Sequence, residues 1–338
     1  MKQLKIFLIL ILLFTIGLNA KDYTKNRVAK EFINMMVKEH HFKRSYLNTL
    51  FKNIKFQKRA LSIFNPKYRK KVKKTINKYP KKGSWDIYEK VHLTDSKVKK
   101  GIEYLRSNRA TFKKVYKKYG VPPEYITAII GVESHYGYNR GKFPALDTLA
   151  TLGFEENRRS KYFRYELKKL LLLSKSQGFN PKDVKSSYAG AIGLGQFMPS
   201  SYHYAVDFNG DGKKSMQTTS DAIAGIANYF KKNGWRKGEP VATRVSFTGN
   251  RFTAKKTGYN HKYSRNSLKG ISPKFDEWKY NGKVRLIKLK RYYYDELWYG
   301  AENFYVITRY NHSSYYAMVI HQLAKRIRGG YWKKYGRF

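Results

Sequence analysis

One carboxylate stands inside an apolar stretch of the sequence, where a side chain could do acid–base chemistry. Glu133 follows Ile126, Ile129 and Ile130 at helical spacing, so the four side chains share one face of a helix. A carboxyl on such a face either pairs with a cation or lies in a cleft, where burial raises its pKa. A raised pKa keeps a proton available near neutral pH, as a general acid requires. On the spacing alone the ion-paired interpretation is favoured, because structural ion pairs are common.

A second candidate is the glycine-rich stretch 187–201. Gly190, Gly193 and Gly195 let a backbone or a ligand approach closely. Gln196 adds a hydrogen-bond donor and an acceptor at the same point. The stretch lacks the lysine of a Walker motif, which argues against a phosphate-binding loop.

A third candidate is an acidic loop with the spacing of a cation site. Asp207, Asn209 and Asp211 place oxygen ligands at positions 1, 3 and 5, with glycine at position 6, as at the start of an EF-hand loop. Position 12, normally a bidentate Glu, is Thr218, and the nearest acid is Asp221 at position 15. A cation site and a metal-free, Asx-rich turn both fit this pattern.

Helices are expected to position these residues. Pro122 and Pro123 start a helix that brings Glu133 near its C-terminal end, before Gly137. A longer helix is predicted over 101–119, and its buried stripe is Ile102, Leu105, Phe112, Val115 and Tyr116. Three further helices are predicted over 160–177, 221–232 and 316–328, and Gly178 ends the first of them.

Beyond residue 238 the pattern changes to alternating apolar and polar residues. This alternation predicts strands at 241–252 and 283–290, and 303–309 is also strand-like. The sequence therefore predicts a mainly α protein of the α+β type, with a small β-containing part.

The charge of the chain indicates a polyanionic environment. Lys and Arg number 70 against 23 Asp and Glu, which gives a net charge of +47. Nucleic acid, an anionic envelope and a membrane surface all fit such a charge. The chain has no cysteine, which excludes disulfides, thiolate zinc sites, a Cys nucleophile and a lipid-modified N-terminal Cys.

The first 20 residues indicate a secretory signal. Lys2 and Lys5 precede an apolar run over 6–18, which is short for a membrane span of about 20 residues. We expect cleavage after Ala20, with an uncleaved anchor as the alternative. The protein is then periplasmic or secreted, with peripheral or no membrane contact, and nucleic acid is not the expected partner.

Together these segments resemble the lytic murein transglycosylase B family. The matches run in family order from about residue 85 to 325, and the block Gly-Gln-Phe-Met-Pro-Ser-Ser at 195–201 is the most specific. The matching segments are 131–134, 157–159, 187–202, 207–212, 227–230 with 234–235, and 309–313.

The resemblance implies a lysozyme-like core flanked by an α domain and a small β-containing domain. The expected parts are a signal peptide (1–20), an N-terminal α-helical domain (21–119), the catalytic core with the EF-hand-like loop (120–237), the β-containing domain (238–315) and a C-terminal helix with a basic tail (316–338).

The resemblance also implies cleavage of the β-1,4 bond between N-acetylmuramic acid and N-acetylglucosamine in peptidoglycan, with a 1,6-anhydro product. Glu133 would be the acid and base. The cleft would be lined by Tyr88, Arg158, Arg159, Ser187, Gln196, Tyr310, Asn311 and Tyr316. A structural calcium would be held by Asp207, Asn209, Asp211, the carbonyl of Lys213 and Asp221. The chemistry would need no cofactor, and the partners would be peptidoglycan strands and other envelope proteins.

The residues themselves agree with a single-carboxylate mechanism. Ordinary glycosidases use two carboxylates, yet no second acid lies close to Glu133 in the sequence or within the glycine-rich stretch. The N-acetyl group of the substrate can take the place of the second acid. Two alternatives stay open: a hydrolytic muramidase, in which water enters the product, and a non-catalytic, secreted glycan-binding protein whose 30 tyrosines stack on sugars.

Overall fold

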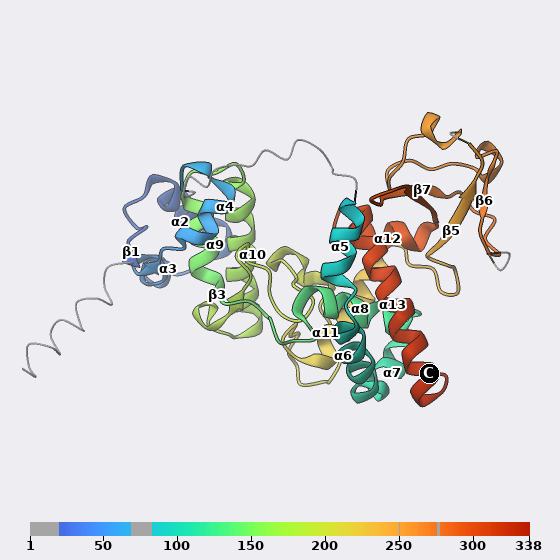
Figure 1. Cartoon of the computed structure of the whole chain (residues 1–338). Coiled ribbons are helices and arrows are strands. Elements are labelled where there is room, and N and C mark those ends of the chain that lie inside the picture. Colours follow the sequence, from blue (N-terminus) through green and yellow to red (C-terminus); the bar gives the residue numbers. More distant parts are fainter. Residues whose placement is uncertain (1–19, 69–82, 250, 276–277) are drawn as a thin grey trace, which may run out of the picture. The chain divides into compact units, whose positions relative to one another are not determined.

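The computed structural model describes residues 20–68, 83–249, 251–275 and 278–338. The expected signal peptide, apart from Ala20, lies outside these residues. The chain divides into two compact units: a first unit of residues 1–73 and 140–203, and a second unit of 74–139 and 204–338 (Figure 1). The five-part division expected from the sequence stays a prediction.

The first unit is a group of helices around an apolar core. Helix α9 (Ala145–Phe154) is almost entirely buried, and α10 (Ser160–Gln177) packs along it. The ring of Phe154 contacts three aromatic rings, those of Tyr23, Phe32 and Phe51. The remaining elements are α2 (Arg27–His40), α3 (Arg44–Lys52), α4 (Lys58–Phe64) and two short antiparallel pairs, β1 (Ala20–Lys21) with β2 (Ile54–Lys55) and β3 (Phe143–Pro144) with β4 (Lys185–Ser186).

The predicted helix 160–177 is confirmed as α10. It ends where Gly178 takes a left-handed conformation with a φ of 68°, and the glycine N–H donates to the carbonyl of Ser174. A glycine adopts this conformation without strain from a side chain.

The second unit is organised around a buried helix, α8 (Pro123–Ser134), which packs against four others (Figure 1). The predicted apolar face is confirmed, because Ile126, Ile129 and Ile130 are fully buried. The surrounding helices are α6 (Asp95–Ser107), α7 (Arg109–Tyr119), α11 (Thr219–Lys232) and α13 (Ser314–Tyr335), and the unit also holds α5 (Ser84–His92) and α12 (Glu302–Tyr310).

A single helix over 101–119 is a wrong prediction. Helix α6 ends at Ser107 and α7 begins at Arg109. The side chain of Asn108 donates to the carbonyl of Tyr104 at 2.9 Å, a local bond of the kind that competes with helix continuation. The break turns Tyr116 outward, with 37% of it exposed, and leaves Ile102 only half-buried.

The residue after α8 folds the chain back between two helices. His135 and Tyr136 both have positive φ, and the Tyr136 hydroxyl donates to the carbonyl of Lys97 on α6 at 2.8 Å. Gly131 and Gly101 leave room for this ring, since a Cβ at either position would lie 2.5 or 2.6 Å from the Tyr136 hydroxyl. The end of α8 is thereby fastened to α6.

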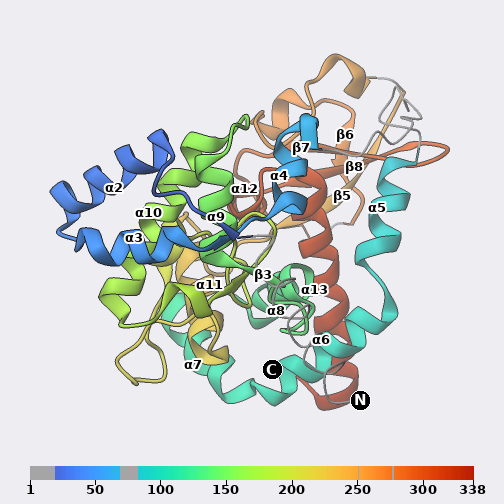
Figure 2. The same ribbon diagram turned by 90° about the vertical axis from the view of Figure 1, so that its left-hand side faces the viewer.

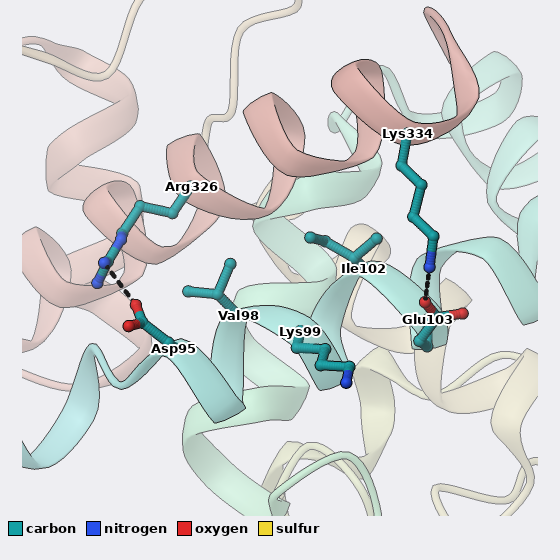
Figure 3. Close-up of a pocket in the computed structure, with 7 residues that line it drawn as sticks. All are labelled: Asp95, Val98, Lys99, Ile102, Glu103, Arg326 and Lys334. Carbon is teal, nitrogen blue, oxygen red and sulfur yellow. Dashed lines mark hydrogen bonds and ion pairs between the residues drawn. The ribbon is translucent and has the colours of Figure 1, made fainter.

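Helix α13 runs past the predicted end at residue 328 and is attached to α6 by ion pairs at two points. Arg326 pairs with Asp95 at 3.0 Å, and Lys334 pairs with Glu103 at 2.8 Å. Between these pairs lies a groove of about 380 Å³ whose apolar wall includes Val98 and Ile102 (Figure 3).

The predicted β-containing part is a four-stranded antiparallel sheet of order β6–β5–β8–β7. Helix α12 packs against β8, and α5 packs against β7 (Figure 2). The predicted strand 241–252 corresponds to β5, which ends five residues earlier than predicted, and the predicted strand 283–290 corresponds to β7. The strands are β5 (Ala242–Phe247), β6 (Ile271–Pro273), β7 (Arg285–Lys290) and β8 (Asp295–Gly300).

A strand at 303–309 is a wrong prediction, because this segment forms α12. Its β-branched residues Val306, Ile307 and Thr308 favour a strand by propensity. In the fold, Phe304, Ile307 and Thr308 are buried at helical spacing, and α12 packs against α13. Tertiary packing therefore overrides the local preference.

Among the described residues, no helix has the combined length and hydropathy needed to cross a bilayer.

Candidate active site

Glu133 lies in the last turn of α8, and its carboxyl accepts a hydrogen bond from a tyrosine. The Tyr316 hydroxyl donates to Oε1 of Glu133 at 2.6 Å. Burial raises the pKa of Glu133 to about 7, and the bond from Tyr316 lowers that pKa in part. In the part of the chain that the structure describes, no ion pair involves Glu133. The carboxyl is thus buried and has no ion pair among the described residues, which argues against the ion-paired interpretation.

Three tyrosines from three helices surround this carboxyl. Tyr88 comes from α5, Tyr310 is the last residue of α12, and Tyr316 lies in the first turn of α13. Burial is the main cause that raises the pKa of each tyrosine, and the negative charge of Glu133 raises each pKa further. At neutral pH all three are hydroxyls, so they can donate hydrogen bonds to an ionised carboxyl or to a sugar oxygen.

The corner between α12 and α13 fixes two of these tyrosines. Ser313 caps α13, because its hydroxyl accepts from the backbone N–H of Tyr316 at 3.2 Å. The ring of Tyr310 lies edge-on to Tyr229 of α11, with 4.9 Å between the centroids. Asn311, which was expected in the cleft, is exposed in this corner.

Tyr88 is held by other aromatic rings. Its ring lies 4.5 Å from that of His92 and 5.8 Å from that of Tyr315, centroid to centroid. Trp85, one turn earlier on α5, is fully buried. Trp85 is thus a core residue, whereas Tyr88 is half-buried and lies near Glu133.

The expected glycan contacts at Ser187 and Gln196 belong to the first unit, in one tight loop. The Ser187 hydroxyl accepts from the backbone N–H of Ala191 at 3.1 Å. Gln196 has a φ of 50°, and its Nε2 donates to the carbonyl of Gly193 at 2.8 Å. This bond leaves the Oε1 atom of a half-buried amide as an acceptor for a ligand.

Arg158 and Arg159 also belong to the first unit, and both are exposed just before α10. The guanidinium of Arg159 lies 4.1 Å from the ring centroid of Tyr162. Stacking of this kind orients a guanidinium while leaving its N–H groups free to bind an anion.

Sequence reasoning missed Glu166, a buried carboxylate of the first unit. It is 1% exposed and accepts from the backbone N–H of Ser200 at 2.9 Å and from the Ser200 hydroxyl at 2.7 Å. The only sequence signal was an acid on the apolar face of the helix 160–177. These bonds hold the end of the glycine-rich stretch against α10.

The expected cation loop is ordered by its own backbone. Asp207 accepts from the N–H groups of Gly210 and Gly212 at 2.8 and 2.9 Å. Asp221 is fully buried and accepts from the N–H groups of Phe208 and Ser215 at 2.9 and 3.0 Å.

The oxygen atoms of this loop are ligands that suit a hard cation, but its acidic side chains do not lie close enough together to form a metal site. Asp207, Asn209, Asp211, Asp221 and the Lys213 carbonyl all offer oxygen, the donor that Ca²⁺ prefers. Within the described residues, no three His, Cys, Asp or Glu side chains lie together as a metal site. The expected ligand set therefore stays a prediction.

The fold and the site together define a class of protein: a helix-rich enzyme with a lysozyme-like core and a buried carboxyl at the end of its central helix. The transglycosylase SLT domain matches residues 24–325, so the chain belongs to this family. This membership confirms the resemblance found in the sequence, and the helix-rich fold confirms the predicted fold class.

Individual relatives are similar over most of their length. Membrane-bound lytic murein transglycosylase B of Escherichia coli (strain K12) is 38% identical over 311 residues, which are 90% of this chain and 84% of the relative. Solved structures of the E. coli lytic transglycosylase SLT35 in complex with calcium and with bulgecin A are each 36% identical. Each covers 94% of this chain, and 97% and 98% of its own chain, with a TM-score of 0.83.

Proposed function

We propose that this lytic transglycosylase cleaves the β-1,4 bond between N-acetylmuramic acid and N-acetylglucosamine in peptidoglycan without consuming water. Glu133 serves as the only acid and base. The observation that supports this most directly is a carboxyl with a pKa of about 7, hydrogen-bonded by Tyr316 in a helix-rich fold of this family.

The first step is proton donation. Near pH 7 about half of the Glu133 carboxyls hold a proton. Glu133 gives this proton to the oxygen that leaves the anomeric carbon, and the carbon–oxygen bond breaks. The N-acetyl group of the substrate stabilises the cationic carbon, which replaces the second carboxylate of ordinary glycosidases.

The second step returns the proton. The ionised Glu133 takes the proton of the sugar's own 6-hydroxyl while that oxygen bonds to the anomeric carbon. The products together have the atoms of the substrate, and Glu133 is again protonated. A pKa near the working pH suits a group that acts first as acid and then as base. Tyr316 keeps the carboxyl oriented for both transfers.

The first unit supplies further contacts to the glycan in this proposal. Ser187 and Gln196 offer hydrogen bonds to sugar hydroxyl and amide groups, and Arg158 and Arg159 offer guanidinium groups to the carboxylates of the stem peptides. Tyr88, Tyr310 and Asn311 contribute the same kind of contact from the second unit. The support is the family match of residues 24–325.

A structural calcium in the acidic loop is part of the proposal, and the relative solved with calcium supports it. Asp207, Asn209, Asp211, Asp221 and the carbonyl of Lys213 would hold the ion. Calcium would neutralise the three carboxylates before α11 and would take no part in bond cleavage.

We place the enzyme in the periplasm, after export by the N-terminal signal, with peptidoglycan strands as its main partner. The similar E. coli protein that is called membrane-bound, the charge of +47 and the apolar segment 6–18 support an envelope location. Other envelope proteins are further partners in this proposal.

The test is mass spectrometry of the soluble products from purified peptidoglycan, with wild-type protein beside Glu133→Gln. We expect muropeptides lighter by one water than hydrolysis products from the wild type, and none from the variant. Glu103→Gln is the matched control, because Glu103 is a surface carboxylate of the same unit and should leave the products unchanged.

Two other results would contradict the proposal. Reducing ends of full mass would make the protein a hydrolytic muramidase. Glycan binding without products from either protein would support a non-catalytic glycan-binding protein.

A further inference from the structure

Helix α5 brings Tyr88 near Glu133, although this helix has little packing of its own. It has nine residues, and isolated helices shorter than about 12–15 residues are marginal in water. Of these nine residues, all of them described, Trp85 alone is buried, and Ile87 and Val91 are 52% and 63% exposed. The position of Tyr88 therefore depends on contacts from other elements of the second unit.

The hydroxyl of Tyr315 joins α5 to two other elements. Tyr315 lies in the first turn of α13, which packs beside α5 (Figure 1). Its oxygen accepts from the backbone N–H of Lys290, the last residue of β7, at 3.1 Å. The Oγ atom of Ser84, the first residue of α5, lies 2.9 Å from the same oxygen. Because a backbone N–H can only donate, the proton of the Tyr315 hydroxyl is available for Ser84.

The ring of Tyr315 contacts the aromatic side chains of α5. Its centroid lies 5.3 Å from that of Trp85, edge-on, and 5.8 Å from that of Tyr88. Rings with centroids about 4.5–7 Å apart attract each other in such tilted arrangements. Tyr88 also contacts His92, but His92 belongs to the same helix and cannot fix Tyr88 relative to Glu133. Among the described residues, Tyr315 is thus the aromatic contact of Tyr88 that comes from another element.

A second attachment of α5 acts on the helix rather than on the Tyr88 ring. Arg291, in the turn after β7, pairs with Asp86 at 3.0 Å and with Glu89 at 2.5 Å. It also pairs with Glu296 of β8 at 2.8 Å. These ion pairs hold α5 against the sheet, whereas the Tyr315 ring contacts Tyr88 itself.

Tyr315 is also next in the chain to the tyrosine that binds Glu133. Tyr316 follows it on α13 and donates to the Glu133 carboxyl at 2.6 Å. The start of α13 therefore presents Tyr316 to Glu133 and, through the Tyr315 ring, contacts Tyr88 as well.

We propose that Tyr315 is a positioning residue for the cleavage reaction. It holds the hydroxyl of Tyr88 in the place where Tyr88 binds the glycan beside Glu133. This inference rests on the proposed function, in which Tyr88 is a glycan contact. Tyr315 itself touches no substrate and transfers no proton.

The test is a double-mutant cycle of Tyr88→Phe and Tyr315→Leu, measured as initial rates of muropeptide release against the concentration of purified peptidoglycan. Tyr88→Phe should reduce kcat/KM about fivefold to tenfold, the expected loss of one hydrogen bond to the substrate. Tyr315→Leu should reduce it by a similar factor. The double variant should lose less than about twofold more than Tyr88→Phe alone, because residues that act through one contact are not additive.

The form of the loss separates positioning from stability. Loss of a binding contact raises KM, so both single variants should raise KM and leave kcat nearly unchanged. A smaller folded fraction would instead lower kcat and leave KM unchanged. Tyr263→Leu is the matched control, because Tyr263 is a half-buried tyrosine of the same unit whose hydroxyl donates to the carbonyl of Lys256 at 2.9 Å. It should lower the melting temperature and change kcat/KM less than about twofold.

Two milder variants decide the proposal if Tyr315→Leu does not fold. Tyr315→Phe and Ser84→Ala each remove one partner of the contact between the Tyr315 hydroxyl and α5. Each should reduce kcat/KM about twofold to fivefold. Neither should reduce it further in the Tyr88→Phe background.

Two results would overturn the proposal. One is independent effects in the double variant, which would multiply to about 25-fold or more. The other is a pH–rate profile of Tyr315→Leu whose basic limb moves to higher pH, because Tyr315 would then act on Glu133 through Tyr316.

Failure of the proposed function gives a different result. The wild type would then release only products of full mass, or none. The same cycle in the Glu133→Gln background, measured as sedimentation with purified sacculi at high salt, still decides whether Tyr315 acts through Tyr88.

Discussion

At the scale of single residues, the position of Glu133 was accessible from the sequence, but its surroundings were not. Helical spacing placed it at the end of an apolar helix, and the structure agrees. Tyr88, Tyr310 and Tyr316 come from segments far apart in the chain, so no local pattern could bring them to Glu133. Only the family resemblance named them in advance. The burial of Glu166 was not predicted, because a single acidic residue in a helix usually lies on the solvent-exposed face.

Removing the Tyr316 hydroxyl should shift the pH dependence of cleavage. Glu133 must be protonated for the first step, so kcat/KM should fall above its pKa of about 7. The bond from Tyr316 lowers this pKa, and Tyr316→Phe should move the basic limb to higher pH while reducing the maximal rate about tenfold or more. The measurement is a pH–rate profile of muropeptide release.

The partner variant for this experiment is Tyr335→Phe, which removes a hydroxyl from the same helix at a half-buried site near Glu103, away from Glu133. Its profile should match the wild type. A Tyr316→Phe profile with an unshifted basic limb would mean that another group controls the limb.

Glu133 should also lower the stability of the protein at high pH. Its pKa is about 7 in the folded chain, against an ordinary value of 4.5 for a glutamate, so the folded state binds the proton more tightly. The contribution of this protonated carboxyl to the free energy of unfolding is then fully present below pH 4.5 and is lost as the pH rises to about 7. Glu133→Gln should raise the free energy of unfolding by about 1–3 kcal/mol at pH 8 and by much less at pH 4. Urea denaturation at both pH values measures this; an equal effect at both would rule out the charge as its cause.

At the scale of elements, helices with strong local end signals were predictable and helices that depend on packing were not. Helix α10 begins and ends where the sequence indicates, since Gly178 marks its end. The break at Asn108 depends on one side-chain bond, and α12 forms from residues that prefer strands. The first error reflects a local side-chain bond that apolar periodicity does not reveal, and the second reflects tertiary packing that overrides strand propensity.

A glycine pair tests the contact that fastens α8 to α6. Gly131→Ala places a Cβ 2.5 Å from the Tyr136 hydroxyl and should destabilise the protein by about 1–3 kcal/mol. Gly329→Ala is the matched control, because nothing lies within 4 Å of its Cβ and α13 should gain about 1 kcal/mol from alanine. Urea denaturation compares the two. Equal effects would mean that helix propensity, not the Tyr136 contact, governs position 131.

At the scale of the whole molecule, composition predicted a polyanionic environment but could not predict how the chain is divided into units. The net charge of +47 is spread along the sequence. The grouping of residues 140–203 with the N-terminal segment depends on contacts between distant parts of the chain. Periodicity describes one segment at a time and therefore could not show that the chain leaves the second unit after α8 and returns to it before α11.

The charge should hold the enzyme on its substrate through salt-sensitive contacts. We expect Glu133→Gln, used so that the wall remains intact, to sediment with purified sacculi at low salt and to be released as the salt concentration rises toward 1 M, where the Debye length is about 3 Å. Retention that ignores salt would assign the binding to uncharged contacts with the glycan.

The distance along the chain between Glu133 and Tyr316 has a consequence for the order in which the protein is made. Helix α8 emerges early, with an apolar surface that α13 covers, and α13 is the last element of the chain. Until α13 has formed, the part of α8 that it covers is exposed, and Glu133 lacks the hydrogen bond from Tyr316. The surroundings of Glu133 are therefore assembled only after α13 has packed on α8, since Tyr316 lies 183 positions after Glu133 in the chain.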